Sequence, residues 1–286
     1  MKETMLAFER QFAELLSGSV LPMNEVLGHV GAVAGKRLRP RLVYLSARLF
    51  GEVTEATHRT ALFVELLHTA TLIHDDVVDE SDVRRGQASV NARFGNKTAV
   101  LAGDYLLSKA MLLLSNPEDH LILQEMLGVA MAMSEGELLQ SEKLKVKSEE
   151  WGKREEELRM DSGLVDPKAL EFQKYAESYL NIIERKTARL ICSCCVGGAL
   201  SATSNLLPLT SNLISSFGLN LGLVFQMRDD ILDHDDPETT AMAERLLPKY
   251  LEKTLQGFDA LGPVAKHPEV LDSFRELVTL SAERNS

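Results

Sequence analysis

Residues 68–86 read HTATLIHDDVVDESDVRRG, and the rest of the chain is best interpreted from this stretch. It closes an apolar segment that has the residue spacing of a helix. At 3.6 residues per turn, His68, Asp75 and Asp79 fall on one stripe, and Asp76 lies a partial turn away from it. The stretch therefore predicts a helix that ends in a cluster of carboxylates.

Such a cluster is unfavourable unless something compensates its charge. Like charges four residues apart cost a helix roughly 0.2–0.5 kcal/mol per pair. Bulk solvent can compensate them, in which case the cluster is an ordinary acidic helix end. A hard divalent cation, which prefers carboxylate oxygens, can do so too.

The same spacing recurs at residues 229–233, DDILD, again at the end of an apolar segment. Asp229 and Asp233 share a helical face, with Gln226 one turn earlier. Two equal clusters favour a site in which two or three Mg²⁺ ions are held between two helices, with substrate phosphate completing their coordination. We expect the metal ligands to be Asp75, Asp79 and Asp229, with Asp76, Asp230 and Asp233 adjoining.

Basic residues accompany both clusters, as a polyphosphate ligand would require. Arg84 and Arg85 follow the first cluster directly, and residues 35–40, GKRLRP, precede a predicted helix N-terminus, where backbone N–H groups favour an anion. A solvated basic loop is the alternative interpretation of GKRLRP. Beside two acidic motifs, the anion-binding interpretation is favoured.

Composition predicts an all-α protein with one domain. The chain has 286 residues, of which 45% are hydrophobic, and we see no Pro/Gly/Ser-rich linker. Long alternating β-branched runs are missing. Residues 141–168 are charge-dense and predict a solvated helix or an excursion from the bundle.

Charge and apolar patterning limit the function classes. The net charge of −11 disfavours nucleic acid and anionic membranes as partners. We see no secretory core at the N-terminus and no apolar run of the ~18 residues that a spanning helix needs, so we expect a cytoplasmic protein. Cys192, Cys194 and Cys195 lie in one apolar stretch and are expected to be buried thiols rather than disulfides.

With these motifs in hand, the chain resembles the trans-prenyl diphosphate synthases, and within them the longer-chain, octaprenyl-type branch. The resemblance covers most of residues 30–235. It is carried, in family order, by GKRLRP, residues 68–86, GDYLLSKA (103–110), SEGELLQ (134–140), RKTA (185–188) and GLVFQMRDDILD (222–233). It implies an isoprenoid synthase-like helical bundle around a central cavity, Mg²⁺-dependent head-to-tail prenyl transfer, and a homodimer.

The resemblance also implies roles for individual residues. Isopentenyl diphosphate would be held by Lys36, Arg39, His68 and Arg85. The allylic diphosphate, farnesyl or geranylgeranyl, would be held by Arg84, Lys186, Thr187 and Gln226. Large aromatic residues near the positions of Ala70 and Thr71 stop chain growth in similar enzymes; both residues are small here, which implies a longer product.

Several alternatives remain open on the sequence. A lone histidine such as His68 is more often a core residue, and Lys186 could be an ordinary surface lysine. His74 beside Asp75 also forms the His-Asp pair of some metal phosphohydrolases. After Asp233 the family pattern is shortened, because its Gly-Lys turn is missing and no lysine appears before Lys249. A catalytically silent partner subunit and a terpene cyclase of the same fold are therefore the rival functions.

Overall fold

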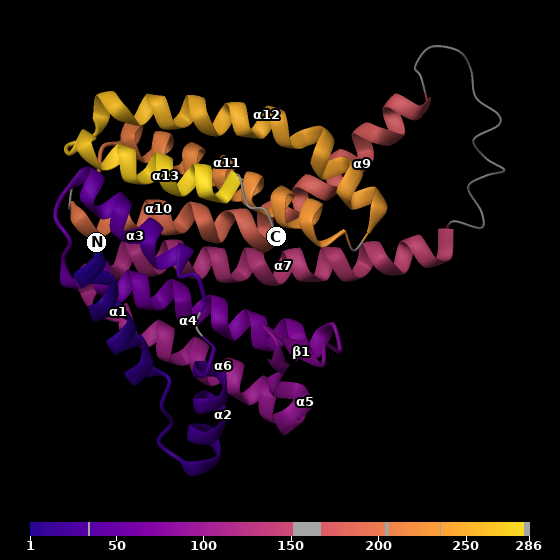
Figure 1. The fold of residues 1–286 in the computed structure, drawn as a ribbon, viewed down its shortest axis with the longest axis horizontal. Helices are drawn as coiled ribbons and strands as arrows, with labels where there is room; N and C mark the ends of the chain where they lie inside the picture. Colours follow the sequence, from indigo (N-terminus) through magenta and orange to yellow (C-terminus); the bar gives the residue numbers. More distant parts are fainter. Residues whose placement is uncertain (34, 151–166, 204–205, 235, 283–286) are drawn as a thin grey trace. The chain divides into compact units, whose positions relative to one another are not determined.

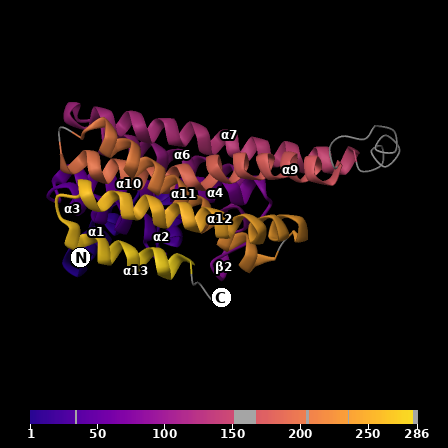
Figure 2. The ribbon, with the colours of Figure 1, turned by 90° about the horizontal axis from the view of Figure 1, so that it is seen from above.

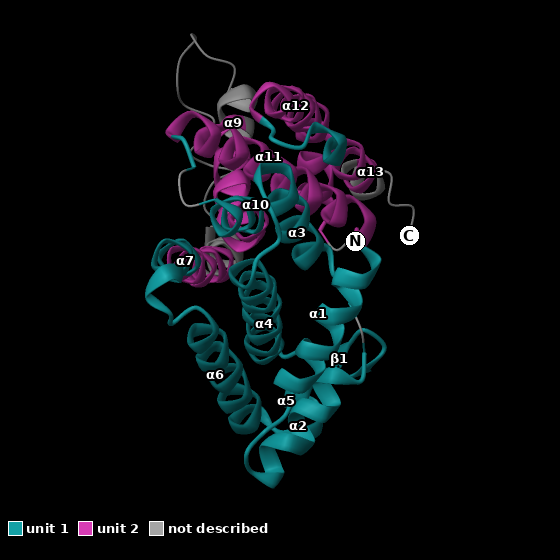
Figure 3. Ribbon diagram, turned by 90° about the vertical axis from the view of Figure 1, so that its left-hand side faces the viewer, with its two compact units in different colours: residues 1–126, 194–207, 265–271 teal, residues 127–193, 208–264, 272–286 magenta. Residues whose placement is uncertain are grey.

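The computed structural model describes residues 1–33, 35–150, 167–203, 206–234 and 236–282. These residues divide into two compact units, coloured separately in Figure 3. Unit 1 comprises residues 1–126, 194–207 and 265–271, and unit 2 comprises residues 127–193, 208–264 and 272–286. The single domain stays a prediction.

Unit 1 is organised around one long helix that carries the first aspartate cluster. Its elements are α1 (Lys2–Leu15), α2 (Leu21–Gly31), α3 (Leu38–Phe50), α4 (Glu55–Val78), β1 (Val83–Arg84), β2 (Gln87–Ala88), α5 (Val90–Phe94), α6 (Asn96–Leu113), η1 (Pro117–Asp119) and η4 (Pro268–Val270). Helix α4 starts at a capping box, in which the Thr54 hydroxyl accepts from the Thr57 backbone N–H. It lies between α3 and α6 (Figure 3) and buries Phe63, Leu66 and Leu67.

Unit 2 carries the second aspartate cluster. It contains α9 (Pro167–Ile183), the π-helical turn η2 (Glu184–Ala188), α11 (Pro208–Asp233), α12 (Pro237–Leu261), η3 (Gly262–Val264) and most of α13 (Leu271–Ala282). Helices α7 (His120–Glu150) and α10 (Arg189–Ala202) contribute residues to both units. Helix α12 runs back alongside α11 (Figures 1 and 2), and both bury apolar residues against Tyr179 and Ala188.

The all-α prediction is confirmed. Of the predicted charged segment at 141–168, residues 141–150 continue α7 and 167–168 begin α9, whereas 151–166 lie outside the described residues. Cys194 and Cys195 are buried, and all three cysteines are free thiols. Within the described part of the chain, no single helix is long and apolar enough to cross a membrane, although one bent pair, Asn96–Leu113 with Pro117–Ser141, passes by length and composition. The cytoplasmic location stays a prediction.

Candidate active site

The first aspartate cluster lies at the C-terminal end of α4, as its spacing predicted. Asp79 is the C-cap residue, and its backbone N–H donates to the carbonyl oxygen of Asp75 at 2.8 Å. Asp75 and Asp79 are therefore one turn apart on the same face, Asp75 half-buried and Asp79 exposed. Asp76 differs, because it is 2% exposed and its Oδ1 accepts from Nε and Nη2 of Arg84. This carboxylate is committed to an arginine.

Arg84 and Arg85 lie on a β-hairpin that the sequence did not predict. Val83 pairs with Ala88 and Arg84 with Gln87, so Arg85 and Gly86 form the two-residue turn. Both turn residues have positive φ, 53° for Arg85 and 79° for Gly86, which is the geometry of a type I′ hairpin turn. The glycine of the Arg85-Gly86 pair was the one local sign of a turn. The two strands have two residues each, which is too short for an alternating apolar and polar pattern to reveal them.

The basic motif at 35–40 approaches this hairpin. A Cβ atom on Gly35 would lie 3.0 Å from Nη1 of Arg85, so the missing side chain makes room for this guanidinium. Arg37 is the N-cap of α3 with φ 52°, and it forms ion pairs with Glu9 at 3.0 Å and Glu65 at 2.7 Å. Arg37 therefore has a structural role, and Lys36 and Arg39 are left as the motif's candidates for ligand binding.

His68 is surrounded by these arginines. Desolvation lowers the pKa of His68 well below 6.5, and the charges of Arg39, Arg85, Arg84 and Arg37 lower it further. The imidazole is consequently neutral at pH 7 and can offer one N–H donor and one acceptor. The structure thus brings together four of the residues predicted for diphosphate binding: Arg39, His68, Arg84 and Arg85.

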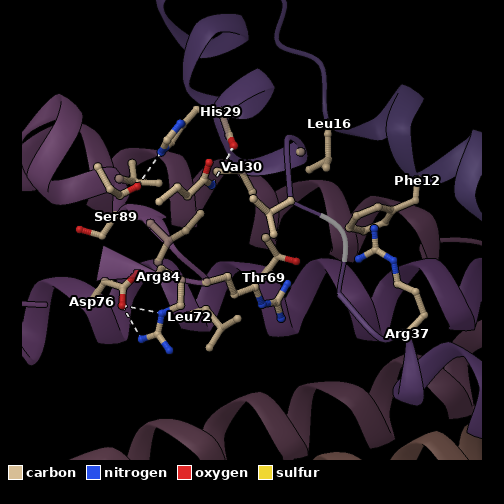
Figure 4. A pocket seen from close by; sticks show the side chains of 17 residues that line it. Phe12, Leu16, His29, Val30, Arg37, Thr69, Leu72, Asp76, Arg84 and Ser89 are labelled. Atoms are coloured by element: carbon tan, nitrogen blue, oxygen red, sulfur yellow. Dashed lines mark hydrogen bonds and ion pairs between the residues drawn. The ribbon is translucent and has the colours of Figure 1, made fainter. Parts of the chain in front are cut away.

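Figure 4 shows a pocket that Arg84 and Arg85 of the hairpin line together with residues of α1 and α2. Phe12 and Arg37 lie at one end, and Asp76, Arg84 and Ser89 lie at the other. Apolar lining comes from Leu16, Val30, Leu72, Ile73 and Val90. The pocket therefore combines a cationic rim with an apolar wall within unit 1.

His74 faces away from the aspartate stripe. Its Nε2 lies 3.2 Å from the carbonyl oxygen of Val100 and 3.4 Å from Oδ1 of Asp104, both on α6. A Cβ atom on Gly103 would be 2.2 Å from the same nitrogen, so the imidazole fills the space that this glycine leaves. These contacts direct His74 to helix packing and do not support the His-Asp pair of a phosphohydrolase.

In unit 2, the second cluster ends α11, and its central carboxylate is held by neighbouring side chains. Tyr179 donates its hydroxyl to Oδ2 of Asp230 at 2.6 Å, and Gln226 donates its amide to Oδ1 at 2.8 Å. Gln226 in turn accepts from the hydroxyl of Thr187 at 2.7 Å. Burial, and then the charge of Asp230, raise the pKa of Tyr179 far above its ordinary value, so this phenol remains a donor. Asp229 is half-buried and Asp233 is exposed.

Lys186 is positioned by the SEGELLQ segment of α7. Its Nζ lies 2.6 Å from Oε2 of Glu137 and donates to Oε1 of Gln140 at 3.2 Å. The prediction that Lys186 is more than an ordinary surface lysine gains support, because it is ion-paired and only 26% exposed. The contacts of Glu137, Gln140 and Tyr179 were not predicted from the sequence.

Two glycines hold the turn that carries Lys186 and Thr187. A Cβ atom on Gly136 of α7 would lie 2.8 Å from the backbone nitrogen of Lys186. One on Gly222 of α11 would lie 2.5 Å from Cα of Ala188. The π-helical turn is thus packed backbone to backbone against both helices. Single π turns inside helices occur frequently at functional sites.

The predicted chain-length positions lie on α4, one turn before the aspartates. Ala70 is 2% exposed, whereas Thr71 is half-buried and donates its hydroxyl to the carbonyl oxygen of His68 at 3.0 Å. Ala70 therefore has little room for a larger side chain, and Thr71 has more.

Helix α11 ends at Asp233, and α12 begins at Pro237. Asp236 caps this helix by accepting from the backbone N–H and the hydroxyl of Thr239. Lys249 lies 12 residues into the helix, and at 1.5 Å per residue this is about 18 Å from its start. We therefore expect that Lys249 does not replace a phosphate-binding lysine next to Asp233.

The donor chemistry of the two clusters fits a hard cation. Carboxylate oxygens are the ligands that Mg²⁺ prefers, and each cluster presents three of these side chains: Asp75, Asp76 and Asp79 in the first, and Asp229, Asp230 and Asp233 in the second. Among the described residues, no three His, Cys, Asp or Glu side chains are already grouped as ligands of one metal.

The chain is similar to a known protein family and to individual enzymes. The family model described as Polyprenyl synthetase matches residues 22–242. The octaprenyl diphosphate synthase of Escherichia coli (strain K12) is 32% identical over 235 residues, which are 82% of this chain and 64% of that enzyme. The all-trans-nonaprenyl-diphosphate synthase (geranyl-diphosphate specific) of Rhodobacter capsulatus is 31% identical over 276 residues, which are 96% of this chain and 75% of that enzyme.

Solved structures share the fold across the whole chain. A polyprenyl synthase from Caulobacter crescentus CB15, complexed with calcium and isoprenyl diphosphate, superposes with a TM-score of 0.75 at 25% identity. The match covers 100% of this chain and 96% of that one.

Proposed function

This chain belongs to the polyprenyl synthetase family, and from that premise we propose that it is a Mg²⁺-dependent trans-polyprenyl diphosphate synthase. It condenses isopentenyl diphosphate head to tail with an allylic diphosphate, farnesyl or geranylgeranyl. The observation that carries the proposal is the gathering of Arg39, Arg84 and Arg85 around a neutral His68, which lies two to three turns before the carboxylates of α4. An anion site next to a cation site is what a metal–diphosphate substrate requires.

Isopentenyl diphosphate binds at the basic side of unit 1. Arg39 and Arg85 present guanidinium groups, which bind phosphate oxygens bidentately. His68, neutral at pH 7, donates one hydrogen bond without adding charge, and Lys36 adds an exposed ammonium. The position of Arg85 against Gly35 supports the joint action of the two basic segments.

The allylic diphosphate is handled by Arg84 together with Lys186, Thr187 and Gln226. Glu137 and Gln140 hold the ammonium of Lys186, and the hydrogen bond from Thr187 to Gln226 fixes the amide. Donors that are positioned in advance stabilise charge as it develops on a leaving group. In our proposal these residues of unit 2 and the aspartates of α4 act on one pyrophosphate.

The aspartates that would hold Mg²⁺ are Asp75, Asp79 and Asp229, with Asp76, Asp230 and Asp233 adjoining. The bound metal supplies Lewis-acid neutralisation of the diphosphate charge. Asp76 fixes the guanidinium of Arg84, and Asp230 fixes the amide of Gln226. The calcium and isoprenyl diphosphate named for the Caulobacter structure support this assignment.

The reaction needs no protein nucleophile. The allylic C–O bond breaks and its electrons leave with pyrophosphate, whose new charge Arg84 and Lys186 neutralise. The double bond of isopentenyl diphosphate attacks the allylic cation, and the resulting cation loses a proton to the departing pyrophosphate. The growing chain extends past Thr71 along the apolar interior, and the long-chain products named for the relatives support a long product here too.

The direct test is incubation with isopentenyl diphosphate, farnesyl diphosphate and Mg²⁺, with products sized by chromatography. We expect polyprenyl diphosphates longer than geranylgeranyl. Cyclic hydrocarbons from farnesyl diphosphate alone would indicate a terpene cyclase instead.

One observation favours a second candidate function. The described residues after Asp233 provide no lysine before Lys249, although the family places a phosphate-binding lysine soon after this motif. A subunit of this kind would regulate an active synthase without elongating. Absence of product from the chain alone, with altered product length when it is added to an active synthase, would identify that role.

A homodimer is the proposed assembly. Exposed apolar side chains on α6 support it, namely Val100, Leu101, Met111 and Leu112. Light scattering after size-exclusion chromatography gives the molar mass, and the proposal expects twice the 31.7 kDa of one chain.

A further inference from the structure

We propose that His29 of α2 is a positioning residue for the hairpin that carries Arg84 and Arg85. The inference rests on the proposed function only in that these arginines bind the substrate diphosphates. The interaction that defines it lies within unit 1 and connects two segments that are 59 residues apart in the chain.

His29 holds strand β2 through both its ring and its backbone (Figure 4). The Nε2 atom lies 2.8 Å from the carbonyl oxygen of Ala88, and the backbone carbonyl of His29 accepts from the side-chain amide of Gln87 at 3.3 Å. Gln87 and Ala88 are the two residues of β2. The whole strand is thereby attached to α2.

Arg93 fixes which ring nitrogen carries the proton. Its Nη1 lies 2.9 Å from Nδ1 of His29, and the ring of Phe94 packs edge-on against the imidazole at 5.6 Å. A guanidinium can only donate, so Nδ1 must be the acceptor and therefore unprotonated. The remaining proton is on Nε2, where it is donated to Ala88.

The hairpin needs such an external contact. Two strands of two residues are not stable on their own, and Arg85 occupies a left-handed backbone conformation that non-glycine residues adopt at a cost. Asp76 holds Arg84 from the side of α4, and Ser89 donates its hydroxyl to the carbonyl oxygen of Ser81 at the base. His29 holds the opposite strand, so loss of this contact would free the turn that aims Arg85.

The test compares His29→Phe with His29→Gln. Phenylalanine keeps the packing on Phe94 and removes both ring hydrogen bonds, whereas glutamine keeps an amide donor near the position of Nε2. His58→Phe is the matched control. The imidazole of His58 also packs against an aromatic ring and forms one hydrogen bond, both with Tyr44, and it is not in contact with the hairpin through these interactions.

Three measurements serve as readouts: amide hydrogen exchange of residues 83–88, the dissociation constant of inorganic pyrophosphate with Mg²⁺, and KM against kcat for isopentenyl diphosphate. In His29→Phe we expect exchange at least tenfold faster, pyrophosphate binding about fivefold weaker, and a raised KM for isopentenyl diphosphate. His29→Gln should return each value to within about twofold of wild type. His58→Phe should leave exchange in the hairpin unchanged.

Unchanged exchange in the hairpin of a folded His29→Phe protein would overturn the proposal, as would equal defects in the phenylalanine and glutamine variants. If His29→Phe does not fold, ¹⁵N spectra of the wild-type imidazole decide: a protonated Nδ1 contradicts the assignment, and a protonated Nε2 with rescue by glutamine supports it. Amide hydrogen exchange can be measured without turnover. An inactive wild-type protein would therefore count against the proposed function, whereas exchange of residues 83–88 would still decide the role of His29.

Discussion

A Cβ atom placed on Gly136 would lie 2.8 Å from the backbone nitrogen of Lys186, so helix α7 and the π-helical turn of unit 2 meet backbone to backbone at this point. The neighbouring Glu137 pairs with the ammonium of the same lysine. One segment of α7 thus sets both the backbone and the side chain of a residue proposed to bind the allylic diphosphate.

The first prediction concerns this contact. Gly136→Ala should displace the turn and its lysine, costing about 1–3 kcal/mol of stability from overpacking and raising KM for the allylic substrate. Gly128→Ala is the control on the same helix, because nothing lies within 4 Å of the added atom. Alanine there should be neutral or stabilise by about 0.5–1 kcal/mol. Equal kinetics for the two variants would argue against the role given to Gly136.

Lysines on either side of the second aspartate cluster give the second prediction. Lys186→Ala should lower kcat by roughly 10²-fold, the usual effect of removing one donor to a developing charge. Lys249→Ala should change kcat less than twofold, because Lys249 lies far along α12 and packs near the ring of Tyr250. A large loss of turnover in Lys249→Ala would instead mean that this lysine replaces the motif that the chain lacks.

The third prediction is a pH dependence of stability due to His68. Its pKa is lowered below 6.5 in the folded protein, so the unfolded chain binds the proton first as the pH falls. The free energy of unfolding should therefore decrease below about pH 6.5, by at most about 1.4 kcal/mol per pH unit for this one group, and should be flat with respect to it above that pH. Urea unfolding of the wild type and of His68→Gln between pH 5 and 8 measures how the free energy of unfolding depends on pH in each protein. The same pH dependence in both would contradict the prediction.

Product length gives the fourth prediction. Thr71→Phe should shorten the longest product, because a phenyl ring one turn before Asp75 blocks the path of the growing chain. Thr71→Val is the control, since it removes the hydroxyl that bonds the carbonyl of His68 but adds no bulk. Ala70→Phe is a poorer test, because Ala70 is buried and a large side chain there should destabilise the fold. An unchanged distribution of product lengths in Thr71→Phe would show that Thr71 does not limit chain length.

The sequence predicted the features that depend on helical periodicity. The stripe of His68, Asp75 and Asp79 follows from 3.6 residues per turn, and α4 extends to Val78 with Asp79 as its cap. Gln226 was expected on the face of Asp229 and Asp233; in the structure it bonds Asp230, four residues on, which helical spacing also allows.

Long-range pairings could not be predicted in this way. Tyr179 and Asp230 are 51 residues apart, and no local pattern links them. Arg37 and Arg39 are equivalent as letters of one motif, but the left-handed backbone and buried glutamate partner of Arg37 give it a structural role. The π-helical turn at Lys186 is packed against Gly136 and Gly222, which are 86 residues apart in the chain.

The central claim is that the aspartates of α4 and α11 act on one metal–diphosphate complex. The most direct measurement is the affinity for inorganic pyrophosphate in the presence of Mg²⁺ for wild type, Asp75→Asn, Asp229→Asn and the double variant. A shared site predicts that each single change weakens binding at least tenfold and that the double change adds much less than the sum, because coupled residues are not additive. Fully additive losses, or affinity that persists in the double variant and in EDTA, would contradict the account.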